Sequence, residues 1–178
     1  MLILVISIIG EAQSKYPYKT IREIQFVHPD SLIVADQIQN SQSNRWKVQA
    51  SNLYLTDTVR IVGVCIVPPK VLNFSAFGYE FVLADTGYSG PWGHMLVRAP
   101  LSASGGTAGD SIYYQTMLAI EVGDIIEVTG WIDEFPVGSA NGISSTTQIV
   151  PLRDPNYSNL GSATLPPIYK LTTADFYK

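Results

Sequence analysis

IEVGDIIEVTGWIDEF, from Ile120 to Phe135, is the part of this sequence that says most about the fold. Its centre, Ile125–Ile132, is rich in β-branched and aromatic residues and follows the turn Val122–Asp124, which predicts a strand that begins after a tight turn. Gly130 lies inside this run. A glycine within a strand usually marks a bulge or a sharp bend, and small barrels turn their corners at such points.

The same pattern occurs upstream. Thr58–Val67 reads TVRIVGVCIV, and Gly63 interrupts its β-branched run. Two long strands that each contain a glycine predict a curved antiparallel sheet.

Five stretches have the composition of strands, and proline or glycine turns separate most of them. They are Val59–Val67, Tyr79–Asp85, Gly93–Ala99, Val122–Phe135 and Ser144–Leu152. Five strands with a long break between the third and the fourth predict a mainly all-β chain that forms an OB-like Greek-key barrel. An antiparallel β-sandwich is the alternative.

The chain is long enough for one domain with tails, at 178 residues of which 46% are hydrophobic. We expect the barrel in residues 58–153, preceded by a lead-in segment, 15–57, and followed by an extended tail, 154–178. Within the lead-in, Thr20 and Glu23 have the spacing of a capping box, which predicts a short helical turn over Thr20–Gln25.

Composition favours a β-rich extracellular protein. Only 15% of the residues are charged, against roughly 25% in an average globular protein. The net charge is −4 and no run of Lys or Arg occurs, so a broad electrostatic footprint for nucleic acid is absent. Cys65 is the one cysteine, which excludes an intrachain disulfide and a cysteine-rich metal site. We expect it to be a small buried hydrophobe.

The N-terminal stretch Leu2–Ile9 is continuously apolar apart from Ser7. It resembles the end of a secretory signal peptide, with a cleavage zone around Ala12, although a basic leader is missing. It is too short to span a bilayer, so no stable membrane span is expected. The alternative is a retained strand that pairs in its own sheet or with a neighbouring subunit. In that case the assembly residues are Leu2, Ile3, Leu4, Val5, Ile6, Ile8 and Ile9.

Catalytic chemistry is not visible in this sequence. His28 and His94 each lack a second ligand at metal-binding spacing, so structural roles are expected for both. Asp133 and Glu134 are neighbours on a strand and point to opposite faces, which prevents them from sharing one substrate atom. No nucleophile elbow, phosphate-binding glycine loop or zinc-protease helix occurs. We therefore expect no enzyme activity, no metal and no cofactor.

Binding is the class of function that the residues favour. OB barrels bind on one curved face and two loops, where aromatic side chains stack on the ligand beside a few cations. The candidates are Arg60, Tyr79, Trp92, Arg98 and Trp131. Single-stranded nucleic acid and polysaccharide both remain open as ligands. An aromatic in a strand usually packs inward, so Phe81 and Trp131 also have an interpretation as core residues.

Several segments occur in the order found in a known class of modules. They are Thr20–Gln25, Val59–Val64, Phe81–Asp85 with Gly90–Gly93, Val122–Gly130 and Leu165–Asp175. The sequence resembles the OB-fold-like modules of secreted bacterial proteins, including those placed ahead of extracellular endonuclease/exonuclease/phosphatase-type nuclease domains. The resemblance implies secretion, an OB-like barrel and a supporting or binding role. In such proteins the catalytic residues lie in a separate downstream domain, so no nuclease activity carries over. Thr172–Asp175 resembles a lead into another module.

The sequence therefore predicts a secreted, non-catalytic OB-like module for binding or assembly at the cell surface. The alternative is a structural subunit of an extracellular assembly or filament, in which homo-oligomers self-assemble by exchanging terminal segments.

Overall fold

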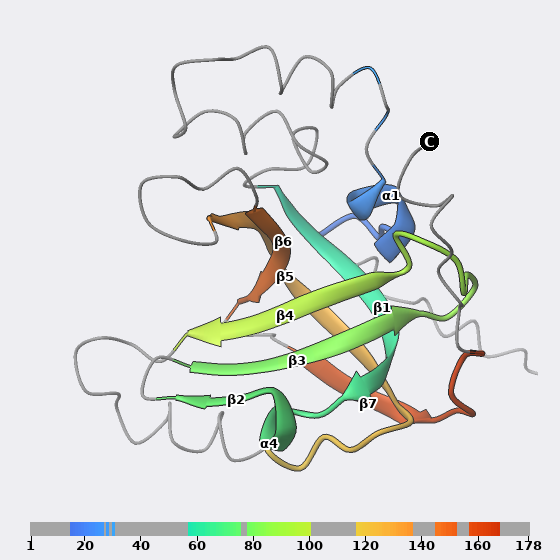
Figure 1. The fold of residues 1–178 in the computed structure, drawn as a ribbon, viewed down its shortest axis with the longest axis vertical. Helices are drawn as coiled ribbons and strands as arrows, with labels where there is room; N and C mark the ends of the chain where they lie inside the picture. The colour runs from blue at the N-terminus through green and yellow to red at the C-terminus, as the bar shows by residue number, and fades with distance from the viewer. Residues whose placement is uncertain are drawn as a thin grey trace, which may run out of the picture.

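The structure is a computed structural model, and it describes residues 15–26, 28, 30, 57–75, 78–100, 117–136, 145–152 and 157–167. The described elements are α1 (Ile21–Gln25), β1 (Thr58–Val67), α4 (Pro69–Leu72), β2 (Asn73–Ser75), β3 (Gly78–Asp85), β4 (His94–Pro100), β5 (Asp124–Pro136), β6 (Ser145–Pro151) and β7 (Tyr157–Ser162) (Figure 1).

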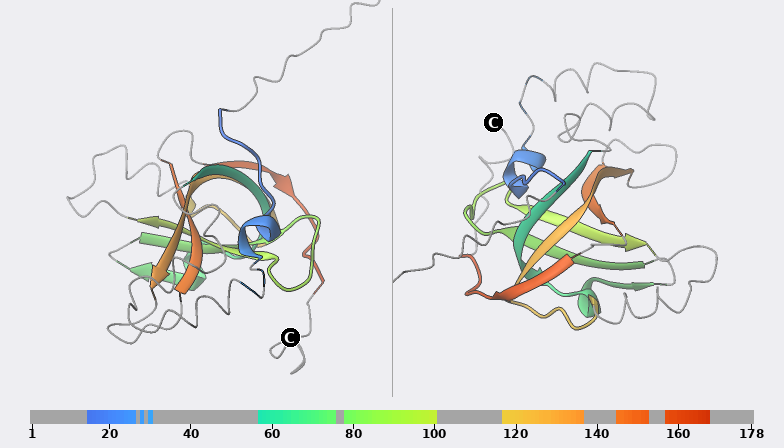
Figure 2. Two further views of the ribbon diagram at one scale, coloured as in Figure 1. Left: turned by 90° about the horizontal axis from the view of Figure 1, so that it is seen from above. Right: turned by 180° about the vertical axis from the view of Figure 1, so that it is seen from behind.

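Five strands close into a barrel in the order β1-β3-β4-β6-β5, and the pairing of β1 with β5 completes the ring. The contact between β4 and β6 is parallel, whereas the other neighbours in the ring are antiparallel. Figure 2 shows the ring from above, with β1 and β5 strongly curved. This arrangement confirms the predicted OB-like barrel, and the sandwich alternative is wrong because the strands form one closed sheet.

The strands of the barrel lie where the sequence predicts them, within one or two residues at each end. The sequence analysis did not predict three of the observed elements. The hairpin strand β2 pairs with the start of β3, the short helix α4 follows β1, and β7 pairs with β5 inside the segment expected to be an extended tail. The N-terminal stretch 1–14, the segment 31–56, the loop 102–110 and the tail beyond 167 lie outside the described residues.

The helical turn predicted in the lead-in is α1, and its capping box is complete. Thr20 Oγ1 accepts from the Glu23 backbone N–H, and the Glu23 carboxylate accepts from the Thr20 backbone N–H. This hydrogen bond to the Thr20 backbone holds the pKa of Glu23 below its ordinary value. Asp85 accepts from the Arg22 backbone N–H at 3.3 Å and from the Gly87 N–H at 2.8 Å, which ties the helix to the end of β3.

The core fills the barrel and extends into α1. The side chains of Ile21 and Ile24 are fully buried and join the cluster of barrel residues. The inward residues of the five strands include Ile61, Phe81, Leu83, Met95, Val97, Ile126, Val128, Ile132 and Ile149. Each such side chain contributes about 1.5–3 kcal/mol when it is removed from water. The helix therefore stabilises the barrel with its own apolar residues.

Gly63 and Gly130 lie where neighbouring strands come too close for a side chain. A Cβ at Gly63 would lie 2.7 Å from Leu83 Cβ and 2.8 Å from the Ala84 carbonyl oxygen. A Cβ at Gly130 would collide with the Val150 carbonyl oxygen and lie 2.8 Å from the carbonyl carbon. Since backbone atoms cannot move aside as a flexible side chain does, the curvature of the barrel requires glycine at both positions.

The strand register continues through both glycines, so the bulge expected there is found elsewhere. The β1–β3 register shifts between Cys65 and Val67, and the β5–β7 register shifts between Asp124 and Ile126. The glycines accordingly allow close approach, and the bulges lie nearer the strand ends.

We expect Gly130→Ala to destabilise the barrel by about 3 kcal/mol, because the new methyl group meets the β6 backbone. Gly87→Ala is the matched control: its Cβ would meet only Asp85 Oδ1, at 3.6 Å. The control should stay within about 0.5 kcal/mol of the wild type. Urea unfolding of the three proteins measures the difference, and equal midpoints would contradict the close approach.

Cys65 is fully buried on the inner face of β1, as expected, and burial raises the pKa of its thiol to about 11. Because only the thiolate reacts, roughly one thiol in a thousand is reactive at pH 8 even before access is considered. We therefore expect a disulfide reagent to label the folded protein only at the rate of unfolding, and to label it within the mixing time in denaturant. Rapid labelling of the folded protein would contradict the burial of Cys65.

Candidate binding surface

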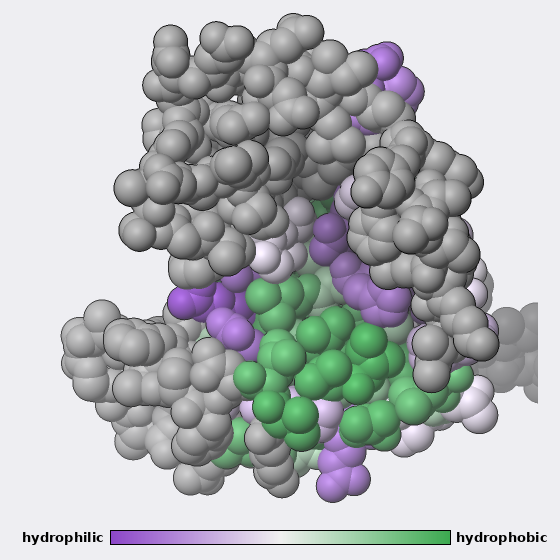
Figure 3. All heavy atoms as spheres, viewed as in Figure 1, coloured by the Kyte–Doolittle hydropathy of each residue, from purple (hydrophilic) through white to green (hydrophobic). Residues whose placement is uncertain are grey.

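An apolar face covers the outside of three neighbouring strands. Val67 on β1 pairs with Val82 on β3, and Val82 pairs with Leu96 on β4. The chain neighbours of Val82 and Leu96 are buried in the core, so these two side chains point outward. Val67 lies on the same side because it pairs with Val82. Figure 3 shows hydrophobic residues gathered over β3, β4 and α4 on this side of the molecule.

The helix α4 extends this surface. Val71 is 72% exposed and Leu72 is 42% exposed. The helix packs beside β2 and β3, in the connection between the first two strands of the barrel. Together Val67, Val71, Leu72, Val82 and Leu96 form what we call the apolar face. In OB folds the corresponding strands and loop make up the ligand-binding side.

Charge at the margin of the apolar face is neutralised. Arg98 lies opposite Glu80 in the β3–β4 ladder, and Arg98 Nε lies 3.5 Å from Glu80 Oε1. Both side chains are about one fifth exposed, at 22% and 21%. The guanidinium therefore already has a carboxylate partner, which reduces the charge that it offers to an anionic ligand.

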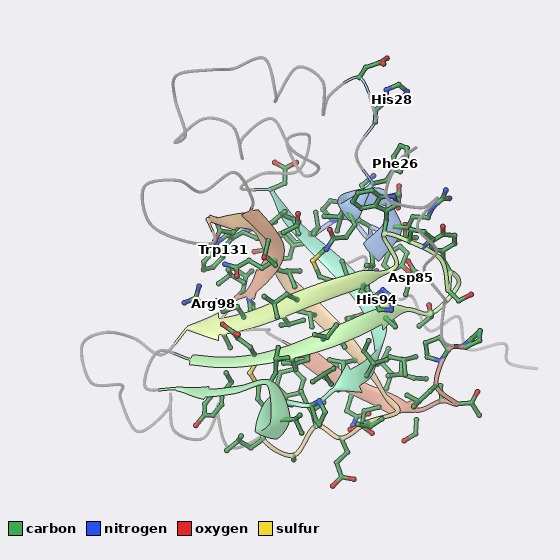
Figure 4. All side chains as sticks on the ribbon, in the orientation of Figure 1. Phe26, His28, Asp85, His94, Arg98 and Trp131 are labelled. Carbon is green, nitrogen blue, oxygen red and sulfur yellow. The ribbon has the colours of Figure 1, made fainter. Side chains whose placement is uncertain are left out.

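A second surface adjoins the first along β5 and β6, and we call it the Trp131 edge. Trp131 points outward from β5 and is 38% exposed. Two residues further on, Asp133 pairs with Gln148 of β6 and accepts a hydrogen bond from Gln148 Nε2 at 2.7 Å. Gln148 also pairs with Leu96, which joins the Trp131 edge to the apolar face. Figure 4 shows Trp131 and Arg98 on the same side of the barrel.

The Asp133–Gln148 hydrogen bond fixes which way the amide faces. A carboxylate can only accept, so the NH₂ group of Gln148 must face Asp133, and Oε1 must face away. Gln148 is 2% exposed, and its Oε1 has no hydrogen-bond partner among the described residues. Such an acceptor is costly to bury, and donors from water or a ligand would satisfy it.

We expect Asp133→Ala to destabilise the fold by about 1–3 kcal/mol, because the Gln148 amide loses its acceptor. Asp133→Asn is the control, since its side-chain carbonyl can still accept from Nε2. Chemical denaturation of both variants tests the pair. If the two variants were equally unstable, the lost stability would come from the charge of Asp133 and not from the hydrogen bond.

Arg60 lies on another part of the wall and is occupied by its own chain. Arg60 Nη1 contacts Glu127 Oε2 at 3.2 Å, and its guanidinium lies 6.0 Å from the centre of the Tyr18 ring. The Arg60 backbone also exchanges hydrogen bonds with Pro17 and Lys19. Burial is the main reason that the pKa of Tyr18 is raised. These contacts assign Arg60 to holding the lead-in segment on β1.

Trp92 lies in the loop between β3 and β4, away from the Trp131 edge at the other end of β4. It is 44% exposed and has a φ of 70°, which is uncommon for a bulky residue. The loop is held in place because Asp85 N–H donates to the Gly93 carbonyl at 2.8 Å. Arg22 of α1 covers the Tyr88 ring of the same loop at 4.5 Å.

The five candidates from the sequence do not form one cluster. Arg98 and Trp131 lie on the same side of the barrel, whereas Arg60 and Trp92 lie elsewhere. Tyr79 packs against the core cluster. Phe81 is fully buried, which confirms its interpretation as a core residue, but that interpretation is wrong for Trp131 because Trp131 faces outward.

The described residues contain no group of three or more His, Cys, Asp or Glu side chains that could hold a metal ion. Within the same residues, no helix has the length and apolar character needed to cross a membrane. His94 lies exposed at the start of β4, and His28 Nδ1 accepts from the Asp30 backbone N–H at 3.3 Å.

Sequence reasoning missed the apolar face, although a signal for it was present. Strands with one solvated face alternate apolar and polar residues, whereas strands covered on both faces are continuously apolar. Phe81–Ala84 and Met95–Val97 are continuous runs. The Asp133–Gln148 pair had no such signal, because it depends on the register of β5 against β6.

No protein-family model matches this sequence, and no curated protein sequence matches it. Among solved structures, the fold is similar to an aspartyl-tRNA synthetase chain from Leishmania major Friedlin, at 14% identity and a TM-score of 0.41, over 66% of this chain and 20% of that chain. It is also similar to the aspartyl-tRNA synthetase of Entamoeba histolytica, at 14% identity and a TM-score of 0.41, over 65% of this chain and 20% of that chain. This chain thus spans about a fifth of either synthetase. At these values the likeness carries no argument about function.

Proposed function

We propose that this chain is a secreted, non-catalytic OB-like module that binds polysaccharide at the cell surface. The observation that supports it is the Trp131 edge, where an outward indole lies beside the hydrogen-bonded Asp133–Gln148 pair. Aromatic rings offer a flat apolar surface to the C–H face of a sugar, and planar polar side chains bind its hydroxyl groups. The resemblance to modules of secreted bacterial proteins supports the extracellular location.

The charges favour polysaccharide over single-stranded nucleic acid. Binding of nucleic acid draws most of its affinity from cations that neutralise phosphates. Here Arg98 faces Glu80, and Arg60 faces Glu127. The whole chain has a net charge of −4. A neutral ligand does not need these two arginines, whose charges are already paired with glutamates.

We expect soluble neutral polysaccharides to slow the protein in affinity electrophoresis. Trp131→Ala should weaken this binding at least tenfold, because truncating a central aromatic contact costs about 2 kcal/mol and a loss of about 1.4 kcal/mol is already tenfold. Trp92→Ala is the matched control, because Trp92 is a similarly exposed indole outside the Trp131 edge. An oligo(dT) strand is the competing ligand. Binding to oligo(dT) that falls steeply with salt, without binding to polysaccharide, would overturn the proposal.

The second candidate is a structural subunit of an extracellular assembly. The specific observation in its favour is the apolar face, which leaves Val71 and Leu72 exposed on a chain that also carries the apolar stretch Leu2–Ile9. Large exposed apolar surfaces mark sites of interaction between proteins. In this candidate the stretch is retained and joins subunits.

A further inference from the structure

We propose that the apolar face binds the stretch Leu2–Ile9 of a second copy of this chain. This inference rests on the assembly candidate and is independent of polysaccharide binding at the Trp131 edge. It identifies the acceptor surface, which the sequence analysis did not predict.

The first argument is that the strands under the apolar face have the composition of strands covered on both sides. β1 is apolar without interruption from Ile61 to Val67, β3 from Phe81 to Ala84, and β4 from Met95 to Val97. These three strands are neighbours in the barrel. In each run the inward residues pack in the core and the residues between them make the outer face apolar as well. An apolar outer face is typical of strands that a second layer covers.

The second argument is the degree of exposure. Val82 and Leu96 are partly exposed, and Val71 and Leu72 continue the surface with exposures of 72% and 42%. Figure 3 shows this face open toward the viewer. Val71 and Leu72 lie on a short helix at the margin of the apolar sheet. They would contact the end of a segment that lies across the strands.

The third argument concerns the chemistry of the occupant. The neutralised Arg98–Glu80 pair at the margin offers little to a charged ligand. Leu2–Ile9 contains no charged residue and is rich in Leu, Ile and Val. In an extended conformation this stretch would span about 26 Å, at roughly 3.3 Å per residue. The apolar face consists of three strands about 4.8 Å apart and the adjoining helix, so a segment of that length can cross it. An extended apolar segment fits this surface in character and in length.

The length of the chain favours a second copy over the same copy. Pro17 and Lys19 bond to Arg60, and the apolar face begins at Val67, seven residues further along β1 or about 23 Å. The connection from Ile9 to Pro17 has eight Cα-to-Cα steps and spans at most about 29 Å when fully stretched. In the same copy this connection would have to be largely extended along the barrel wall, whereas a neighbouring copy can approach without that constraint.

The test uses the full chain with single cysteines introduced at the two proposed partners. One sample carries Val5→Cys and the other carries Val71→Cys. The native Cys65 is buried, so we expect mild oxidants not to react with it. On mixing and mild oxidation, we expect a disulfide-linked dimer on a non-reducing gel, several times more abundant than with Leu160→Cys in place of Val71→Cys. Leu160 is the matched control because it is 55% exposed but lies on β7, away from the apolar face.

A second measurement separates the inference from the assembly candidate. Sedimentation of the full chain should show oligomers that the double variant Val71→Asp/Leu72→Asp converts to monomers, with circular dichroism unchanged because both side chains are exposed. The control variant Leu160→Asp should leave the oligomers intact. Oligomers that survive the double variant, or dimer yields equal to the Leu160 control, would overturn the apolar face as the acceptor while leaving assembly standing. A monomeric wild type, or a native protein whose intact mass starts between Ala12 and Lys15, would overturn both.

Discussion

The pairing of β1 with β5 is the constraint on which the rest of this structure depends. It runs without a register shift from Thr58–Trp131 to Val64–Ile125 and turns a curved sheet into a closed ring. Closure requires tight curvature, and the curvature is possible because Gly63 and Gly130 leave room for neighbouring backbone and Cβ atoms. A closed ring has no free edges among its own strands, so β1 and β5 determine both the core and the surfaces that remain outside.

The lead-in segment precedes the barrel in the sequence, but its apolar residues pack in the barrel core and stabilise it. Ile21 and Ile24 fill space beside the inward residues of the strands, and a complete capping box starts the helix that carries them. Asp85 bonds to the first turn of that helix and to the loop after β3. A short helix is marginal alone, so its order here comes from packing on the barrel.

Two adjacent surfaces divide the candidate functions between them. The Trp131 edge offers an indole beside the partly exposed carboxylate of Asp133, while the apolar face offers aliphatic side chains and almost no charge. Arg98 lies beside both surfaces, but its charge is neutralised because Arg98 Nε is 3.5 Å from Glu80 Oε1. Neutralised cations and an acidic chain are the reason that we propose neutral ligands or protein partners in place of phosphate.

The sequence by itself determined the five strands of the barrel, the cap of α1 and the turns between strands, because these depend on near neighbours: β-branched runs, Pro and Gly breaks, and the Thr20–Glu23 spacing. It also led to the OB-like barrel, since five such strands have few ways to close. Only the tertiary structure decided that β7 pairs with β5, that Trp131 faces outward, and that Val67, Val82 and Leu96 lie side by side. Those facts depend on strand register between distant segments, and a shift of one residue would send each side chain to the opposite face.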